Sequence, residues 1–419
     1  MRRTSRGQVS QLAKAAALGL AGALALTACG GGGGAGDSSK VVYWDTSGPN
    51  ESPVFKKIAE GCASKDGYQV SVETVAFDQA RSNFKTSAQG GQGADVFRAE
   101  VAWVPELAHN GLVVDLTDTA LGKDTADFLE VPLGSTKYNG KTYGVPQVTD
   151  ALALYYNKKA LADAGIAVPT TWDQVKAAGA KLGEKTLFIN NDGYYALPFI
   201  YGQGGDLVDT ASKKILVNSP ESVQGLETAK GLLDAKAAQT AQDPTNSNTN
   251  MKAAFSTGGV AMVIDGPWAA VDLLKGDAFK DPANLGIAPV PGGSAGSSSP
   301  VGGHDYVVRQ GSKAKDNAIK LVQCMSSTAS QVTIAKELGL LPTRKSAYES
   351  AEVKAQPVVA GFTPVVQKAH PRPWIPQGGE LFDPLKIAYA DVLSGKKTAK
   401  AALDEAAKTY KDQVVKDYS

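Results

Sequence analysis

The sequence predicts an α/β protein whose folded body begins near residue 40. Short apolar stretches at 41–44 and 70–75 alternate with segments such as 54–62, where apolar residues recur at helical spacing. Alternation of strands and helices favours a parallel sheet with helices on both faces. With 419 residues, the chain is also longer than a typical domain of about 100 to 200 residues, which favours two lobes.

Local signals place the first elements. Ser52 followed by Pro53 opens a helix as N-cap and first-turn proline. Asn139-Gly140 lies between two short aromatic-bearing stretches and predicts a tight hairpin turn. The other elements expected in this half are strands at 41–44, 70–75 and 94–97, a helix through Phe84 and a helix at 104–110.

The second half is predicted in the same way. Thr171 and Gln174 form a capping box that opens a helix, and Ser219 followed by Pro220 opens another. Residues 190–205 lack periodicity and are long enough for a binding loop. The remaining expectations are a strand entering a helix at 148–157, a strand at 260–264, a loop at 289–303, a helix at 316–325 and a C-terminal helix capped by Thr398.

Residues 1–28 have the composition of an export signal. Four basic residues and no acidic ones accompany the apolar run 15–28, which is too short to span a membrane. Leu26-Thr27-Ala28-Cys29 resembles the lipobox of bacterial lipoproteins, which implies cleavage before Cys29 and a lipid on its thiol. The alternative is a plain signal peptide with an incidental Cys29. A Gly-rich tether is expected at 29–39.

Charge and composition exclude several kinds of partner. The net charge is +1, and it becomes −3 once the four basic residues of 1–28 are removed, so no basic surface for nucleic acid is expected. The three histidines His109, His304 and His370 have no Cys or carboxylate at metal-ligand spacing. We therefore expect no metal and no cofactor, and we interpret these histidines as surface or hydrogen-bonding residues.

Two apparent catalytic motifs do not meet their structural requirements. Five residues separate Gly134 from Gly140-Lys141-Thr142, whereas a phosphate-binding loop needs four. Ser294 lies in a Gly-x-Ser-x-Gly pattern, but flexible loop composition follows it where a nucleophile elbow needs a helix. A pair of catalytic carboxylates stays open, because acids from separate loops can converge in the fold.

Cys62 and Cys324 both lie on or beside the apolar faces of predicted helices. In an exported protein two such residues can form a disulfide. The alternative is two buried free thiols, and thiol titration of the denatured chain distinguishes the two.

Seven segments carry a family resemblance through their order and spacing together. They are 44–47, 95–103, 138–146, 153–158, 169–172, 261–268 and 375–377. They resemble the extracellular solute-binding proteins of ABC importers, in the family that binds maltose, maltodextrins and related oligosaccharides, and the resemblance spans the mature chain. Segments 44–47 and 95–103 are more similar to the lipoprotein type of high-GC Gram-positive bacteria.

This resemblance implies a two-lobed periplasmic-binding-protein-like (type II) fold, with a hinge and a ligand cleft between the lobes. It implies that residues 40–149 with 281–340 form the first lobe. Residues 150–280 with 341–419 form the second. The expected protein is a monomer on the outer face of the cell membrane, with an oligosaccharide ligand and the permease subunits of an ABC transporter as partners.

A sugar ring offers apolar faces and a rim of hydroxyls, so its site needs aromatic platforms and hydrogen-bonding side chains. The resemblance implies that Trp268 stacks on sugar, although it could instead be a core residue. Asp150 is expected to bind hydroxyls unless it is a solvated loop acid or helix cap. Phe382 stands where the family often has Trp, and Trp374 is expected to supply that platform. The residues expected to contact ligand are Asp45, Thr46, Glu51, Arg98, Glu100, Trp103, Asp150, Tyr194, Trp268, Trp374 and Phe382.

The function predicted from these observations is capture of a sugar for import, without covalent chemistry. Two other classes stay open at this stage. An exported hydrolase acting on glycans would release cleaved product, whereas an adhesin or structural surface lipoprotein would bind no small ligand.

Overall fold

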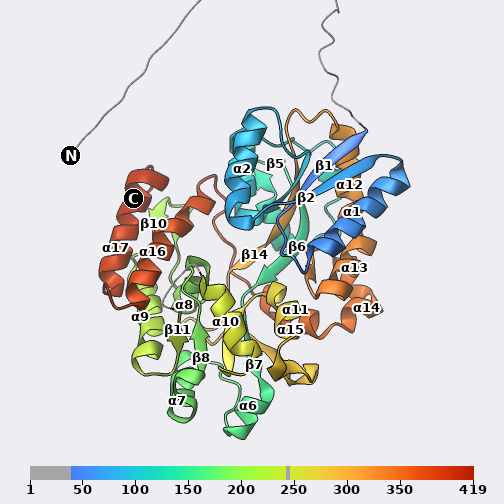
Figure 1. Ribbon diagram of the computed structural model, residues 1–419. Helices are drawn as coiled ribbons and strands as arrows, with labels where there is room; N and C mark the ends of the chain where they lie inside the picture. Colours follow the sequence, from blue (N-terminus) through green and yellow to red (C-terminus); the bar gives the residue numbers. More distant parts are fainter. Residues whose placement is uncertain (1–38, 242–245) are drawn as a thin grey trace, which may run out of the picture. The chain divides into compact units, whose positions relative to one another are not determined.

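The computed structural model describes residues 39–241 and 246–419, which belong to one compact unit with two main β-sheets (Figure 1). The predicted signal peptide, Cys29 and nearly all of the predicted tether lie outside the described residues. In the described part of the chain, none of the helices combines the length and apolar character that a bilayer span requires.

The first sheet has six strands in the order β15-β6-β14-β3-β1-β2. Its parallel part consists of β1, β2 and β3, whereas β14 runs antiparallel to β3 and β6. The prediction of a parallel sheet is therefore correct for β1 to β3, whereas the complete first sheet is mixed. The strands of this sheet are β1 (Lys40–Asp45), β2 (Gln69–Thr74), β3 (Val96–Glu100), β6 (Val145–Ala151), β14 (Val301–Val308) and β15 (Leu341–Pro342).

Helices cover both faces of the first sheet, as predicted. Val96 of β3 belongs to the apolar cluster that includes Ala59 of α1 (Ser52–Asp66) and Leu321 of α12 (Lys315–Met325). The next residue, Phe97, belongs to a separate cluster with Phe84 of α2 (Phe77–Gln89). Successive strand residues thus pack against opposite layers, and Figure 1 shows α2 on one side of the sheet and α1 and α12 on the other.

The second sheet has five strands in the order β11-β8-β12-β7-β13. Its strands are β7 (Ala153–Asn157), β8 (Leu187–Ile189), β11 (Gln239–Thr240), β12 (Met262–Asp265) and β13 (Leu285–Ala288). Two short hairpins complete the β-structure: β4 (Lys137–Tyr138) with β5 (Lys141–Thr142), and β9 (Val208–Asp209) with β10 (Lys214–Ile215).

The chain crosses between the two sheets at places that differ from the sequence prediction. The run expected as one strand at 148–157 is divided by Leu152, with β6 in the first sheet and β7 in the second. β13 pairs with β7 in the second sheet, although the expected boundary at 280 assigns it to the first lobe. β15 pairs with β6 in the first sheet, although the expected boundary at 340 assigns it to the second lobe.

The helices account for most of the remaining chain. They are α1 (Ser52–Asp66), α2 (Phe77–Gln89), α3 (Val104–His109), α4 (Ala120–Lys123), α5 (Glu130–Ser135), α6 (Lys158–Asp163), α7 (Trp172–Leu182), α8 (Leu197–Gly202), α9 (Pro220–Asp234), α10 (Ser247–Ser256), α11 (Ala270–Leu273), α12 (Lys315–Met325), α13 (Thr328–Leu338), α14 (Ala351–Lys354), α15 (Pro357–Val366), α16 (Phe382–Leu393) and α17 (Ala399–Thr409).

The capping predictions are confirmed at three helices and wrong at one, because Ser52 is the first residue of α1 and Glu51 stands at the N-cap position without a side-chain cap. The Thr171 hydroxyl accepts a hydrogen bond from the backbone N–H of Gln174 at 3.2 Å and caps α7. Ser219 caps α9 and Thr398 caps α17 in the same way. The prediction of a loop at 190–205 is wrong for its centre, because a short 3₁₀ turn at Gly193–Ala196 leads directly into α8.

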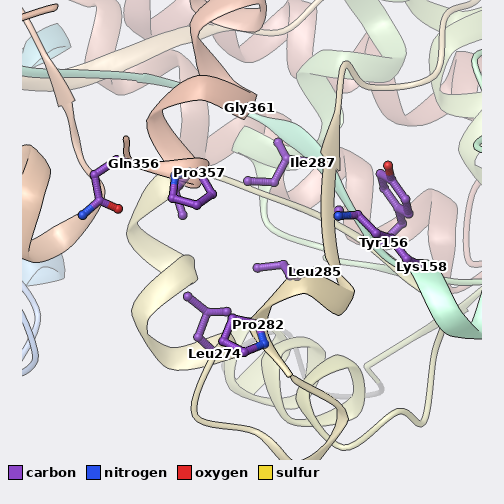
Figure 2. Close-up of a pocket in the computed structure, with 11 residues that line it drawn as sticks. Tyr156, Lys158, Leu274, Pro282, Leu285, Ile287, Gln356, Pro357 and Gly361 are labelled. Carbon is purple, nitrogen blue, oxygen red and sulfur yellow. The ribbon is translucent and has the colours of Figure 1, made fainter. Parts of the chain in front are cut away.

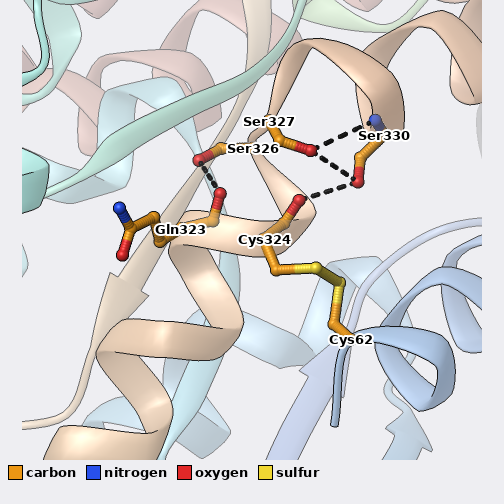
Figure 3. Close-up of a disulfide and its surroundings, with 6 residues drawn as sticks. All are labelled: Cys62, Gln323, Cys324, Ser326, Ser327 and Ser330. Carbon is orange, nitrogen blue, oxygen red and sulfur yellow. Dashed lines mark hydrogen bonds between the residues drawn. A yellow bond between two sulfur atoms is a disulfide. The ribbon is translucent and has the colours of Figure 1, made fainter. Parts of the chain in front are cut away.

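The predicted disulfide is present and joins α1 to the end of α12 (Figure 3). The Cα atoms of Cys62 and Cys324 are 5.8 Å apart, within the range that a disulfide spans. The Cys324 carbonyl accepts a hydrogen bond from the Ser330 hydroxyl at 2.7 Å, which ties α12 to the first turn of α13. The alternative of two free thiols is therefore excluded.

Candidate functional site

The first group of predicted site residues lies at the carboxyl edge of the first sheet. β1 and β3 are parallel, so Asp45 at the end of β1 and Glu100 at the end of β3 meet at the same edge. Arg98 Nη1 donates to Thr46 Oγ1 at 3.2 Å, and Thr46 Oγ1 donates to the Arg98 carbonyl at 2.9 Å. Arg98 Nε donates to Gln147 Oε1 at 2.7 Å, so neighbouring side chains hold this buried cation in place.

The second group follows the carboxyl ends of β8 and β12 in the second sheet. Tyr194 lies in the 3₁₀ turn after β8, and Trp268 lies in the 3₁₀ turn after β12. Their ring centroids are 6.5 Å apart, and those of Tyr194 and Phe382 are 6.3 Å apart. Trp268 packs so closely on Gly266 that a Cβ there would lie 2.0 Å from the indole ring. The Gly266 position thus permits this orientation of the indole ring.

Arg372 links the two groups, and the sequence analysis missed it. Its buried guanidinium donates to Glu100 Oε1 of the first group. The guanidinium carbon also lies 5.6 Å, 5.8 Å and 5.6 Å from the ring centroids of Tyr194, Trp374 and Phe382. Burial acts to lower the pKa of Arg372, but Glu100 and Tyr194 counter it and the pKa is raised. Arg372 stands between two prolines, two residues before Trp374, and this position was the sequence signal that could have identified it as a site residue.

Asp150 lies beside this arginine at the end of β6. Asp150 Oδ1 and the Tyr194 hydroxyl are buried and have no hydrogen-bond partner among the described residues. Both atoms approach Gly302, where a Cβ would lie 2.1 Å from the carboxylate oxygen and 2.6 Å from the hydroxyl. Burial raises the pKa of Asp150 to about 7, although the positive charge of Arg372 opposes the shift. Asp150 is therefore neither a solvated loop acid nor a helix cap.

Other polar groups around the same edge of the first sheet are buried and have no partner in the part of the chain that the structure describes. They include Glu51 Oε1, both ring nitrogens of His304, and Arg372 Nε. His304 stands opposite Glu100 in the β14–β3 ladder, so its position also belongs to this edge. Most buried polar atoms in proteins have a hydrogen-bond partner, and a cluster of exceptions indicates a place where a ligand supplies one. We call Glu51, Asp150, Tyr194, His304 and Arg372 the unpaired cluster.

Two of the predicted site residues are occupied by contacts within the protein. The fully buried Asp45 accepts hydrogen bonds from the backbone N–H and the hydroxyl of Ser47, at 3.1 Å and 2.6 Å. Trp103 stacks on Phe97 with 6.0 Å between ring centroids, and it also lies beside Phe77 at 5.0 Å. Neither carries an unpaired polar atom of the kind that marks the cluster.

Contacts also join the loops of the two sheets beside this cluster. Asn50, just before α1, donates to the Asp272 carboxylate of α11 and accepts from Lys275 Nζ at 2.9 Å. Arg81 of α2 pairs with Glu380 at 3.4 Å. The unpaired cluster is thus enclosed by contacts between the elements of both sheets.

A separate hollow of about 300 Å³ lies outside this region and has a different character (Figure 2). Its walls come mainly from β13 and the start of α15, and most of its lining side chains are apolar. No member of the unpaired cluster lines it. Its lining residues are Tyr156, Lys158, Leu274, Pro282, Leu285, Gly286, Ile287, Gln356, Pro357, Val358 and Gly361.

The family is decided by a match between residues 48–332 and the bacterial extracellular solute-binding proteins. The chain belongs to this family. The GacH receptor of Streptomyces glaucescens, described unliganded and in complex with acarbose and an acarbose homolog, is 42% identical with a TM-score of 0.87. That match covers 91% of this chain and 99% of the receptor.

More distant relatives cover similar shares of the chain. The maltotriose binding protein of Thermus thermophilus, solved with maltotriose, is 25% identical with a TM-score of 0.78, over 90% of this chain and 99% of that protein. A maltooligosaccharide ABC transporter solute-binding lipoprotein of Streptococcus pneumoniae is 27% identical over 86% of both chains. The periplasmic-binding-protein fold is confirmed, and membership of a non-enzymatic transporter family sets aside the hydrolase and adhesin alternatives.

Proposed function

We propose that this solute-binding protein captures maltose, a maltodextrin or a related α-linked oligosaccharide and delivers it to the permease of an ABC importer. The observation that carries the proposal is the unpaired cluster, which combines two carboxylates, a phenol, an imidazole and a guanidinium. Aromatic rings of Tyr194, Trp374 and Phe382 surround the guanidinium. Hydrogen-bonding groups beside aromatic platforms match the hydroxyl rim and apolar faces of a sugar.

The relatives agree with this class of ligand. The proteins from Thermus thermophilus and Streptococcus pneumoniae carry maltotriose or maltooligosaccharide in their names, and the GacH receptor binds acarbose. The 42% identity to GacH supports an oligosaccharide or a close analogue as the ligand of this chain. Trp268, half-buried beside Tyr194, is proposed to stack on a sugar ring.

The same cluster supplies a reason for two lobes to close on ligand. With the described contacts in place, the unpaired atoms are buried, and each such atom costs about 1 to 3 kcal/mol when no partner replaces water. A bound sugar supplies those partners and so favours the closed arrangement. We propose that the lobes move about the chain crossings near Leu152, between β13 and β14, and after β15.

We further propose that cleavage before Cys29 and lipid attachment to its thiol hold the protein on the outer face of the membrane. The lipobox-like sequence and the lipoprotein relative support this. Metabolic labelling with palmitate should label the wild type and leave Cys29→Ala unlabelled, whereas a wild type without label would contradict lipid anchoring.

Calorimetry tests the binding function directly. Titration with maltose, maltotriose and maltotetraose should give saturable heat, and the sugar recovered afterwards should be unchanged. Cleaved sugar, or the absence of heat with every member of the series, would contradict the proposal.

A further inference from the structure

Phe77 is one of two large apolar side chains that the described part of the chain leaves exposed. It is 44% exposed at the first position of α2, next to the unpaired cluster. Its ring centroid lies 5.0 Å from that of Trp103 and 6.0 Å from that of His304. Trp103 in turn approaches Gly379, where a Cβ would lie 3.4 Å from the indole. Phe77 therefore stands where elements of the first sheet meet the segment before α16.

His304 beside it has hydrogen-bonding capacity that the described part of the chain does not use. Both ring nitrogens are buried and have no partner there. Burial, together with the positive charges of Arg98 and Arg372, lowers the pKa of His304 well below its ordinary value. The ring is therefore neutral, with one N–H donor and one acceptor nitrogen. Adjacent hydroxyls of a sugar, one accepting and one donating, fit this pair.

We propose that Phe77 and His304 form a further sugar subsite, in which the Phe77 ring supports the apolar face of one pyranose and His304 binds its hydroxyls. This subsite rests on the proposed function and deepens it, because it makes the preferred ligand one unit longer than the cluster around Arg372 accommodates alone. Trp103 acts as a positioning residue that holds the Phe77 ring from behind.

The subsite predicts how affinity depends on ligand length. Calorimetry of the wild type with maltose through maltohexaose should show an affinity that rises until the subsite is filled. Phe77→Ala should weaken binding of the ligands that fill it about tenfold and remove that last rise. Ile387→Ala is the matched control, because Ile387 is the other exposed large apolar side chain, at 63% exposure on α16. This control should bind every ligand as the wild type does.

His304→Phe separates a binding role from a structural one. Phe has a similar shape and removes two unpaired polar atoms, so the melting temperature of the ligand-free protein should stay the same or rise. Affinity for the ligands that fill the subsite should fall about tenfold. A lower melting temperature with unchanged affinity would overturn the binding role of His304.

The failure of this subsite is distinguishable from failure of the proposed function. Wild-type protein that binds none of the sugars would refute the function, and the subsite with it. If the wild type binds sugar but Phe77→Ala and Ile387→Ala show the same affinities across the whole series, the subsite alone is overturned.

Discussion

Arg344 and Arg372 are both buried arginines, yet their surroundings differ in kind. Arg344 donates to the Ser326 carbonyl at 2.6 Å and to carboxylates of Asp124 and Asp127, and its guanidinium lies 4.1 Å from the Phe128 ring centroid. Arg372 pairs with a single carboxylate, leaves Nε without a partner and faces three aromatic rings. Arg344 is paired with the protein around it, whereas Arg372 has capacity left for a ligand.

The difference separates residues that stabilise the fold from residues that bind. A buried polar group that is fully paired contributes to stability, and its loss leaves partners unsatisfied. A buried group without a partner costs stability until a ligand arrives. Substitution of a paired group such as Arg344 should therefore lower the free energy of unfolding, whereas substitution in the unpaired cluster should lower sugar affinity.

Removal of the disulfide should give the largest loss of stability. The Cys62→Ala/Cys324→Ala variant lacks the covalent bond between two residues that are 262 positions apart. The free energy of unfolding should fall by about 4 kcal/mol. Urea denaturation measures the loss, and calorimetry should show unchanged sugar affinity. Unchanged stability would show that helix packing alone holds α1 to α12.

Arg344→Ala should cost about 2 to 3 kcal/mol, because the buried Ser326 carbonyl loses its side-chain donor and Asp124 and Asp127 lose the cation that faces them. The variant should bind sugar with wild-type affinity at temperatures where it is folded. If the sugar affinity falls by more than the loss of stability explains, the distinction between Arg344 and Arg372 is contradicted.

Asp150→Asn is the corresponding test in the unpaired cluster. A hydrogen bond from a sugar hydroxyl to a carboxylate is worth about 2 kcal/mol, so affinity should fall about thirtyfold. Asp209→Asn is the matched control on an exposed turn, and it should bind as the wild type does. Equal affinities of the two variants would remove Asp150 from the site.

Asp150 should also make the ligand-free protein less stable as the pH rises. Its pKa is raised to about 7 in the folded state, so between pH 4 and 7 the folded protein holds a proton that the unfolded chain has lost. Stability from this proton is lost as pH rises through 7, by about 1.4 kcal/mol between pH 6 and 8.

Urea denaturation at pH 6 and pH 8 measures this effect. His304, whose pKa is lowered, acts in the opposite direction below pH 6.5. The difference between the wild type and Asp150→Asn therefore isolates the carboxylate. Identical pH profiles for the two proteins would contradict a buried, protonated Asp150.

Local signals in the sequence predicted most elements, because caps and turns depend on neighbouring residues. Asn139 and Gly140 adopt the positive φ values of 47° and 75° that their hairpin turn requires. The family resemblance put the boundary between the lobes at 149, three residues before the change of sheet at Leu152. Local patterns did not mark this change, because residues 145–155 form one continuous buried run without a period. Which sheet β13 joins depends on long-range pairing with β7, which no local pattern records.

Site residues could be predicted from the sequence only where they lie in or between segments that resemble the family. Trp268 lies in such a segment, whereas Asp150 and Tyr194 were selected by their positions between such segments. The structure brings Asp150, Trp268 and Arg372 close to Tyr194. Arg372 and His304 were missed, because what marks them is the absence of a hydrogen-bond partner. That property arises from packing between distant segments and does not appear in the spacing of residues.

A crystal structure of the complex with maltotriose tests the central claim most directly. Sugar hydroxyls should lie within hydrogen-bond distance of Asp150 Oδ1, the Tyr194 hydroxyl and Arg372 Nε, the atoms that lack partners among the described residues. Sugar bound at another place, for example in the hollow between β13 and α15, with those atoms still unpaired, would contradict the proposed binding site.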